Sequence, residues 1–194
     1  NVLDFGAGQG ALASRLASAG LFRSIECVDL LTKPKSFPDG IPWHICDLNS
    51  PTAIADLSFD AILSAELIEH LENPRAVARE WFRLLKPGGW LLFSTPNNES
   101  VRSLIALVCR GHYSAFGESS YPAHITALLR KDIERITKEA GFEMIRFHFT
   151  DHGMLPKAKR LSWQLLSGAV LRGLRFSDNL LAVCRKPTEG DDQQ

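Results

Sequence analysis

The most constraining feature of the chain is a short apolar strand that runs straight into a glycine-rich turn. The segment VLDFGAGQG occupies residues 2–10, and residues 11–19 have the apolar spacing of a helix. A compact apolar run is typical of a strand buried in a parallel sheet. The glycines let the backbone turn sharply and approach a ligand closely, and the first amides of the helix point toward that turn. The sequence therefore predicts the ligand cradle of an α/β nucleotide-binding fold.

Strand and helix patterns alternate along the rest of the chain. Strands are expected at residues 24–30, 41–46, 60–65, 90–95, 142–149 and 179–185, and helices at residues 51–57, 74–85, 99–110 and 131–140. Two prolines and a glycine favour a loop over a crossover helix at residues 31–40. This rhythm predicts an α/β fold around a mostly parallel sheet.

Length and charge limit the kinds of partner that the chain can have. Its 194 residues are enough for one domain with a substantial core. Its 22 basic and 22 acidic residues balance, so no overall field attracts nucleic acid, and no nucleic-acid partner is expected. The four cysteines form no C-x-x-C pair, which favours reduced thiols and a cytoplasmic location. No apolar stretch is long enough to cross a bilayer.

The ends of the chain and one internal segment carry further expectations. We expect a domain over residues 1–187, N-terminal helices preceding it, and a disordered polar tail over residues 188–194. Residues 155–176 have an apolar face ringed by basic side chains. This segment is either a surface helix that packs on the domain or on a second copy in a homodimer, or an interfacial helix that makes a peripheral membrane contact.

Acidic residues stand at the ends of three expected strands, where open α/β sheets bind ligands. These are Asp4, Asp29 and Asp47. The glycines alone also satisfy the G-x-G-x-x-G/A pattern of dinucleotide binders. A carboxylate at Asp4, however, repels a pyrophosphate and suits a ligand with a positively charged amino-acid end. Each aspartate taken alone could instead be a turn or helix-cap residue.

Several segments together resemble the class I S-adenosylmethionine-dependent methyltransferases. Residues 4–10, Asp29 and residues 46–48 are similar to the first three motifs of that family, and residues 59–66 resemble the fourth. Residues 84–97 and 140–142 resemble segments that follow. The nearest resemblance is to the small-molecule O-methyltransferases of the ubiquinone-biosynthesis type. It implies a Rossmann-like, doubly wound, mostly parallel seven-stranded sheet with an antiparallel last strand and helices on both faces.

The resemblance also implies S-adenosyl-L-methionine as the cofactor and S-adenosyl-L-homocysteine as the product. The glycine turn would hold the methionine end, Asp29 the ribose diol and Asp47 with Leu48 the adenine. The backbone near Ala65 and Glu66 would contact the methionine amino group. The full set of implied cofactor-binding residues is Asp4, Gly6, Ala7, Gly8, Gly10, Asp29, Leu30, Asp47, Leu48, Ala65 and Glu66.

The residues expected to carry the chemistry lie in ELIEH, at residues 66–70. If a helix begins here, Glu66, Glu69 and His70 share one face at spacings i, i+3 and i+4. The histidine could then act as a general base, or the three side chains could hold a divalent cation, as a similar stretch does in ubiquinone-type enzymes. A purely structural role at the start of a helix is the remaining alternative, and no metal is assigned.

A second candidate, His124, precedes the helix at residues 131–140 and resembles the substrate-lid region of the family. The expected lid or insertion segments are residues 99–130 and 155–176. The sequence thus predicts a methyltransferase for the hydroxyl of a hydrophobic or lipid-linked small molecule, with His70, Glu69 and His124 as catalytic candidates. The alternatives are an NAD(P)-dependent oxidoreductase and a non-catalytic S-adenosylmethionine-binding domain.

Overall fold

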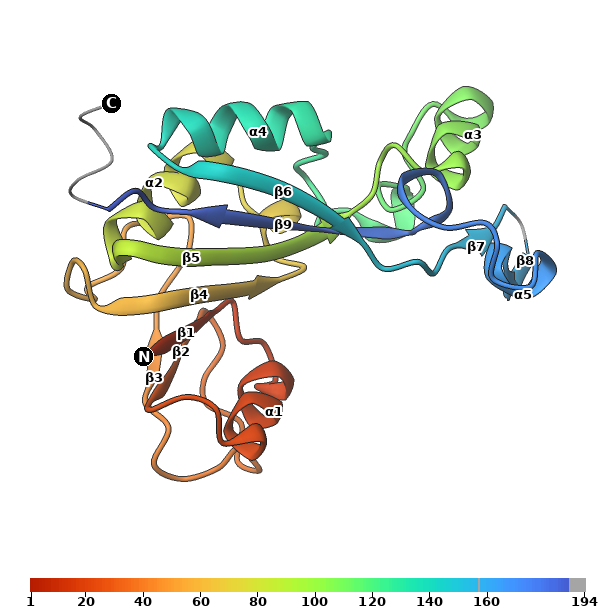
Figure 1. The fold of residues 1–194 in the computed structure, drawn as a ribbon. Helices are drawn as coiled ribbons and strands as arrows, with labels where there is room; N and C mark the ends of the chain where they lie inside the picture. Colours follow the sequence, from red (N-terminus) through yellow and green to blue (C-terminus); the bar gives the residue numbers. More distant parts are fainter. Residues whose placement is uncertain (157, 189–194) are drawn as a thin grey trace.

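The computed structural model describes residues 1–156 and 158–188, and a seven-stranded sheet forms its centre (Figure 1). The strand order is β3-β2-β1-β4-β5-β9-β6. The strands are β1 (Val2–Phe5), β2 (Ile25–Asp29), β3 (Trp43–Ile45), β4 (Phe59–Ala65), β5 (Leu85–Pro96), β6 (Glu143–Phe149) and β9 (Asn179–Arg185). Strands β1 to β5 are parallel, and β9 is antiparallel to both β5 and β6. The predicted mostly parallel sheet with an antiparallel last strand is confirmed.

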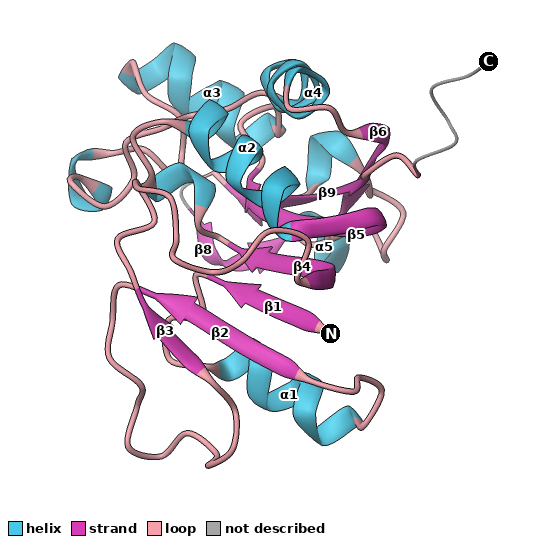
Figure 2. Ribbon diagram, turned by 90° about the vertical axis from the view of Figure 1, so that its left-hand side faces the viewer, coloured by secondary structure: helices cyan, strands magenta, loops and turns pink. Residues whose placement is uncertain are grey.

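Helices cover both faces of this sheet, as expected. They are α1 (Ala11–Ala19), α2 (Pro74–Leu84), α3 (Val101–Arg110), α4 (Arg130–Glu139) and α5 (Trp163–Leu166), with short 3-10 turns η1 (Ile68–His70), η2 (Glu118–Ser120) and η3 (Leu174–Phe176). Helix α1 lies on one face, and α2 and α4 lie on the other (Figures 1 and 2). No helix in the described part of the chain is both long and apolar enough to span a membrane.

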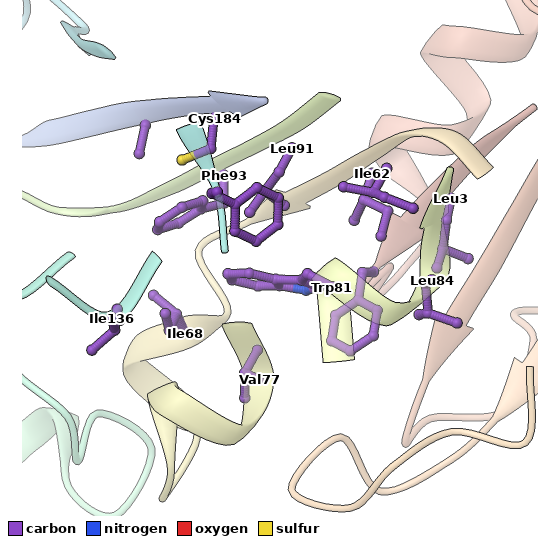
Figure 3. Close-up of a cluster of buried hydrophobic side chains, with 14 of the residues drawn as sticks. Leu3, Ile62, Ile68, Val77, Trp81, Leu84, Leu91, Phe93, Ile136 and Cys184 are labelled. Carbon is purple, nitrogen blue, oxygen red and sulfur yellow. The ribbon is translucent and has the colours of Figure 1, made fainter. Parts of the chain in front are cut away.

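The main hydrophobic core lies between the sheet and helices α2 and α4. Trp81 of α2 is fully buried, and its ring contacts the rings of Phe5 and Phe93 at centroid distances of 5.9 and 5.0 Å. Figure 3 shows this tryptophan facing the apolar side chains of the strands. Large aromatic side chains contribute most to such a core, because each buries a large apolar area. The core therefore holds the central strands, and their carboxyl ends, in fixed positions.

One predicted helix is wrong: residues 51–57 form an irregular loop. The buried Glu80 of α2 accepts hydrogen bonds from the backbone N–H and the hydroxyl of Thr52, at 2.9 and 2.7 Å. Arg83 donates to the carbonyl of Ile54 at 2.8 Å. Because these side chains satisfy the backbone of the loop directly, it needs no helix of its own. The loop predicted at residues 31–40 is confirmed.

The single helix considered for residues 155–176 is also wrong. The structure has a two-stranded sheet of β7 (Met154–Leu155) and β8 (Ala158–Ser162), followed by the one-turn α5 and then η3. Gly168, Ala169 and Gly173 all have positive φ angles, and this left-handed backbone cannot continue a helix. The segment lies beyond the carboxyl ends of β4 and β5 (Figure 1). The expected disordered tail lies, after Thr188, outside the described residues.

The four cysteines form no disulfide with one another. Cys27 and Cys184 are buried in the sheet, Cys46 is partly exposed and Cys109 is exposed on α3, and all four are free thiols. Burial raises the pKa of the Cys27 and Cys184 thiols to about 12, which keeps them protonated and unreactive. They act as small apolar side chains of the core.

Candidate functional site

A cavity of about 830 Å³ opens at the carboxyl ends of β1, β2 and β4. Its walls contain nine residues that the sequence analysis singled out: Asp4, Gly6, Ala7, Gly8, Asp29, Leu30, Ala65, Glu66 and His70. Ala11, Leu12, Leu31, Leu67 and Ala123 complete the lining. The last of these belongs to a loop far along the chain, and no local pattern points to it. Residues from four separate segments thus converge on one hollow.

The glycine turn between β1 and α1 shapes the floor of this cavity. Gly6 and Gly8 have φ angles of +85° and +56°, in the left-handed region that favours glycine. A Cβ on Gly6 would lie 2.7 Å from Cδ2 of Leu67, whereas a Cβ on Gly8 would meet no protein atom within 4 Å. The space above Gly8 is therefore open to a ligand. Gly10 caps α1 and lies against Phe37, outside the cavity lining.

Asp4 is almost fully buried, with 1% of its surface exposed, and it supports the start of α1. Its Oδ2 accepts a hydrogen bond of 3.0 Å from the backbone N–H of Ala13, in the first turn of that helix. The pKa of Asp4 is raised to about 6, mainly by burial and also by the charge of Asp29, against the lowering effect of the bond from Ala13. This carboxyl therefore changes charge near neutral pH and touches the cavity.

Asp29 stands at the end of β2 and holds two turns of the cavity wall. Its Oδ2 accepts from the N–H of Gly8 at 2.7 Å, and its Oδ1 accepts from the N–H of Leu31 at 2.8 Å. Each carboxylate oxygen retains a second lone pair for a ligand hydroxyl. Asp29 is thus bonded directly to the glycine turn, and its role toward a ribose stays a prediction.

The predicted adenine-binding pair, Asp47 and Leu48, does not line the cavity. Oδ1 of Asp47 accepts from the backbone N–H and the side-chain amide of Asn49, at 3.0 and 3.1 Å, which makes it an ordinary turn residue here. Leu48 is buried and belongs to the main hydrophobic core. Their role toward a cofactor stays a prediction.

Glu66 does not share a helical face with Glu69 and His70, because the helix expected at residues 66–70 is only the single turn η1. Glu66 precedes that turn with a φ of +51°, and its Oε1 accepts from the hydroxyl of Ser94 at 2.6 Å. Burial raises its pKa, while hydrogen bonds from Ser94 and Asn179 and the nearby histidines oppose the rise. Glu66 therefore lies near the other two side chains and lines the same cavity as His70, but it does not share a helical face with them.

Glu69 is completely buried, with 0% of its surface exposed. Its Oε2 accepts from the hydroxyl of Thr95 at 3.0 Å, whereas its Oε1 has no hydrogen-bond partner among the residues that the structure describes. Burial, together with the charge of Glu66, raises the pKa of this carboxyl to about 7, although its own backbone N–H and Thr95 lower it. Such an unpartnered buried oxygen is costly unless another group satisfies it.

His70 and His124 come together although they lie far apart in the sequence. Nδ1 of His70 donates to the carbonyl of Ala123 at 2.8 Å, so the lone pair of this ring is on Nε2. The two imidazole rings pack edge to face with centroids 4.7 Å apart, and Nδ1 of His124 is buried without a hydrogen-bond partner in the described part of the chain. One ligand atom from each of Glu69, His70 and His124 lies within 4.8 Å of the others.

Comparisons with known proteins agree with this geometry. The methyltransferase domain family matches residues 1–146. The chain is 30% identical to a ubiquinone biosynthesis O-methyltransferase of Paracidovorax citrulli, over 95% of this chain and 76% of that protein. It is 27% identical to the protein of the same name from Thiobacillus denitrificans, over 82% of this chain and 72% of that protein. A S-adenosylmethionine-dependent methyltransferase structure from Archaeoglobus fulgidus is similar with a TM-score of 0.67 at 18% identity, over 95% of this chain and 85% of that one.

Proposed function

The chain belongs to the S-adenosylmethionine-dependent methyltransferases, and from this premise we propose that it methylates a hydroxyl oxygen of a hydrophobic or lipid-linked small molecule. The observation that carries the proposal is that His70 lies in the wall of the same cavity as the cofactor motif. One cavity can thus bind the methyl donor and present a base to the acceptor hydroxyl. The names of the two relatives support an oxygen acceptor.

The residues of the cavity fit the cofactor. Bound S-adenosylmethionine supplies an activated methyl group on a positively charged sulfur. The glycine turn would leave space for its methionine end, and the carboxylate of Asp4 would complement the positive charge of its ammonium group. Asp29 has lone pairs for the ribose hydroxyls, and Leu30 and Leu31 offer apolar surface to the base. Transfer then requires mainly that the chain hold the acceptor in line and exclude water.

We assign the loss of the acceptor proton to His70, with Glu69 and His124 beside it. The bond from Nδ1 to the carbonyl of Ala123 leaves Nε2 of His70 as the atom that can act on an acceptor hydroxyl. The carboxyl of Glu66 stands on the same cavity wall. A neutral hydroxyl is a poor nucleophile, so this assistance is worth roughly 10²- to 10⁴-fold in rate.

Exposed apolar side chains support a hydrophobic acceptor and a peripheral membrane contact at the cytoplasmic surface. Leu107 and Val108 of α3 and Leu165 and Leu166 of α5 are exposed, and both helices lie at the end of the molecule beyond β4 and β5 (Figure 1). Exposed arginines lie in the same two regions: Arg110, Arg172 and Arg175. Apolar side chains with basic neighbours favour an anionic lipid surface. A second copy of the chain covering these side chains is the alternative.

Ligand titration and product release test the proposal. Calorimetry with S-adenosylmethionine and with NADH should show binding of the former only, whereas binding of NADH alone would indicate an oxidoreductase. Release of S-adenosylhomocysteine should then be screened with phenols and lipid-linked hydroxyl compounds. A cofactor-binding protein that releases no product with any of them would be a non-catalytic domain.

The variant His70→Ala tests the assignment of the proton step. We expect kcat to fall by roughly 10²-fold or more, while the Kd for S-adenosylmethionine changes little. His152→Ala is the matched control, because His152 is exposed and lies outside the cavity lining. Undiminished turnover in His70→Ala would remove His70 from the chemistry and leave the cofactor assignment intact.

A further inference from the structure

We infer that Trp43 is a positioning residue for the cofactor: it holds Leu31, and through Leu31 it orients the carboxylate of Asp29 toward a ribose diol. The inference rests on the proposed function for the place of the cofactor and goes beyond it, because Trp43 lies outside the cavity lining. Trp43 is the first residue of β3, the strand at the edge of the sheet next to β2 (Figure 2).

Two backbone amides orient the carboxylate of Asp29. The N–H of Gly8 donates to its Oδ2 at 2.7 Å, and the N–H of Leu31 donates to its Oδ1 at 2.8 Å. One bond on each oxygen fixes the plane of the carboxylate, and both oxygens keep a lone pair for a ribose hydroxyl. A binding group held in this way loses little freedom when the ligand arrives. The affinity for a ribose therefore depends on how firmly each amide is held.

The two amides differ in what holds them. The turn of Gly8 is fastened to β2, because the carbonyl of Val28 accepts from the first two N–H groups of that turn, at 2.8 and 3.2 Å. Leu31 instead stands near the start of an irregular loop, which joins β2 to β3 over residues 30–42, and 49% of its surface is exposed. The amide of Leu31 is therefore the one that needs support from elsewhere in the chain.

A side chain takes the place of a helix at Leu31. Parallel strands are usually joined by a helix, in which each carbonyl accepts from an N–H four residues later. Prolines at positions 34, 38 and 42 do not fit the interior of a helix. Nε1 of Trp43 supplies a donor instead, and it donates to the carbonyl of Leu31 at 2.9 Å. Both polar groups of the Leu31 backbone are thus used, one toward Asp29 and one toward Trp43.

The direction of the indole ring of Trp43 is set by packing. This ring meets the ring of Phe37 edge to face, with centroids 5.1 Å apart. Phe37 is buried, and its ring lies so close to the glycine turn that a Cβ on Gly10 would be 2.3 Å from it. The backbone of Trp43 pairs with that of Cys27 in β2. The indole therefore has its own anchors, in the turn and in the sheet, and can hold Leu31 from a fixed place.

Loss of the indole N–H should weaken the contact with the ribose selectively. Without that bond the carbonyl of Leu31 turns to solvent, and its N–H is free to leave the carboxylate of Asp29. The methionine end of the cofactor is proposed to lie over the glycine turn, which is bonded to β2 and does not depend on Trp43. A ligand with ribose hydroxyls should therefore lose affinity, whereas one without them should not.

Calorimetry with two ligands tests the inference: S-adenosylhomocysteine, and its analogue that lacks both ribose hydroxyls. Trp43→Phe keeps a ring against Phe37 but has no N–H. We expect it to raise the Kd for S-adenosylhomocysteine roughly three- to tenfold, the effect of one lost hydrogen bond, and to leave the Kd for the analogue unchanged. Trp90→Phe is the matched control, because Trp90 lies on β5, is partly exposed and is outside the cavity lining. Its two Kd values should equal those of the parent chain.

Denaturant unfolding checks that each variant is folded under the conditions of the titration. If Trp43→Phe is not folded, Trp43→Tyr takes its place, since it also lacks the indole N–H. An unchanged Kd for S-adenosylhomocysteine in the variant would overturn the inference and leave the proposed function standing. An equal rise for both ligands would do the same, because Trp43 would then support only the fold of the loop. A parent chain that binds neither ligand would contradict the proposed function, and the inference with it.

Discussion

At the residue scale, the carboxyl of Asp4 serves both the fold and the proposed cofactor site. One of its oxygens holds the first turn of α1, and its carboxyl also touches the cavity. With its pKa raised to about 6 by burial, the carboxyl in the free protein keeps its proton to a higher pH than in the unfolded chain. Its contribution to stability therefore falls as the pH rises from about 4 to about 6.

The affinity for S-adenosylmethionine should show the opposite dependence. The ammonium end of the cofactor favours the ionised carboxyl, so binding should weaken as the pH falls through about 6. We expect the Kd at pH 5 to be about tenfold higher than at pH 7.5. Asp4→Asn keeps an acceptor for Ala13, and its Kd should be higher at pH 7.5 and nearly constant over this range. A parent chain whose calorimetric Kd does not change with pH would contradict the contact with Asp4.

Most of the cavity residues could be predicted because they lie in contiguous motifs at strand ends. The rule that parallel strands end at one edge of a sheet predicts Asp4, Gly8 and Asp29 beside one another, and all three line the cavity. The meeting of His70 with His124 could not be predicted, because the residues between them form several elements. Nor could the turn role of Asp47, since an aspartate after a strand looks the same in sequence whether it meets a ligand or a neighbouring amide.

At the scale of elements, a matched pair of glycines flanks α1, one in the turn before the helix and one at its end. Gly8 lines the cavity and Gly20 caps the far end of α1; both have positive φ angles, and a Cβ on either would meet no protein atom within 4 Å. We expect Gly8→Ala and Gly20→Ala to lower the free energy of unfolding equally, by about 1 kcal/mol, through backbone strain alone.

The two substitutions should differ in their effect on the cofactor. A methyl group on Gly8 occupies the space proposed for the methionine end, so Gly8→Ala should raise the Kd for S-adenosylmethionine at least tenfold. Gly20→Ala should leave it unchanged. Denaturant unfolding of the two variants gives their free energies of unfolding, and calorimetry gives their Kd values for S-adenosylmethionine. Equal cofactor affinities would place the cofactor elsewhere than over this turn.

Elements with strong local signals were predicted well, and those decided by distant contacts were not. Helix α1 and strand β9 have the predicted bounds, because their apolar spacing and flanking residues suffice. Residues 51–57 remain a loop because Glu80 and Arg83, on a later helix, bind their backbone. Residues 155–176 have the composition of an amphipathic helix, but left-handed residues at 168, 169 and 173 end it after one turn.

At the scale of the whole molecule, exposed apolar side chains gather at the end that carries α3 and α5. Val108 and Leu165 are 86% and 67% exposed there, and Leu21, which is 79% exposed, follows α1. We expect the chain to sediment with vesicles containing phosphatidylglycerol. The double variant Val108→Glu, Leu165→Glu should sediment several-fold less, because it places two charges at the apolar contact. Leu21→Glu should behave as the parent chain.

Sedimentation equilibrium decides between lipid and a second copy. A parent chain that stays out of the pellet, and that forms a dimer abolished by the double variant, would assign these side chains to an interface between copies. A monomer in solution that binds vesicles would support the membrane contact. The net charge of zero makes overall attraction to anionic lipid weak, so the local arginines and apolar side chains must supply the binding.

The contact between His70 and His124 depends on a loop that is bonded to η1. The carbonyl of Glu69 accepts hydrogen bonds from the N–H groups of Ile125 and Thr126 in that loop. Those two amides can exchange with deuterium only when the loop lifts from η1, which also separates His124 from His70. Their exchange rates therefore report how often the site opens, and mass spectrometry can measure them in a chain without labels or substitutions. Any molecule that bridges the two histidines should slow the exchange of these two amides, whatever reaction follows.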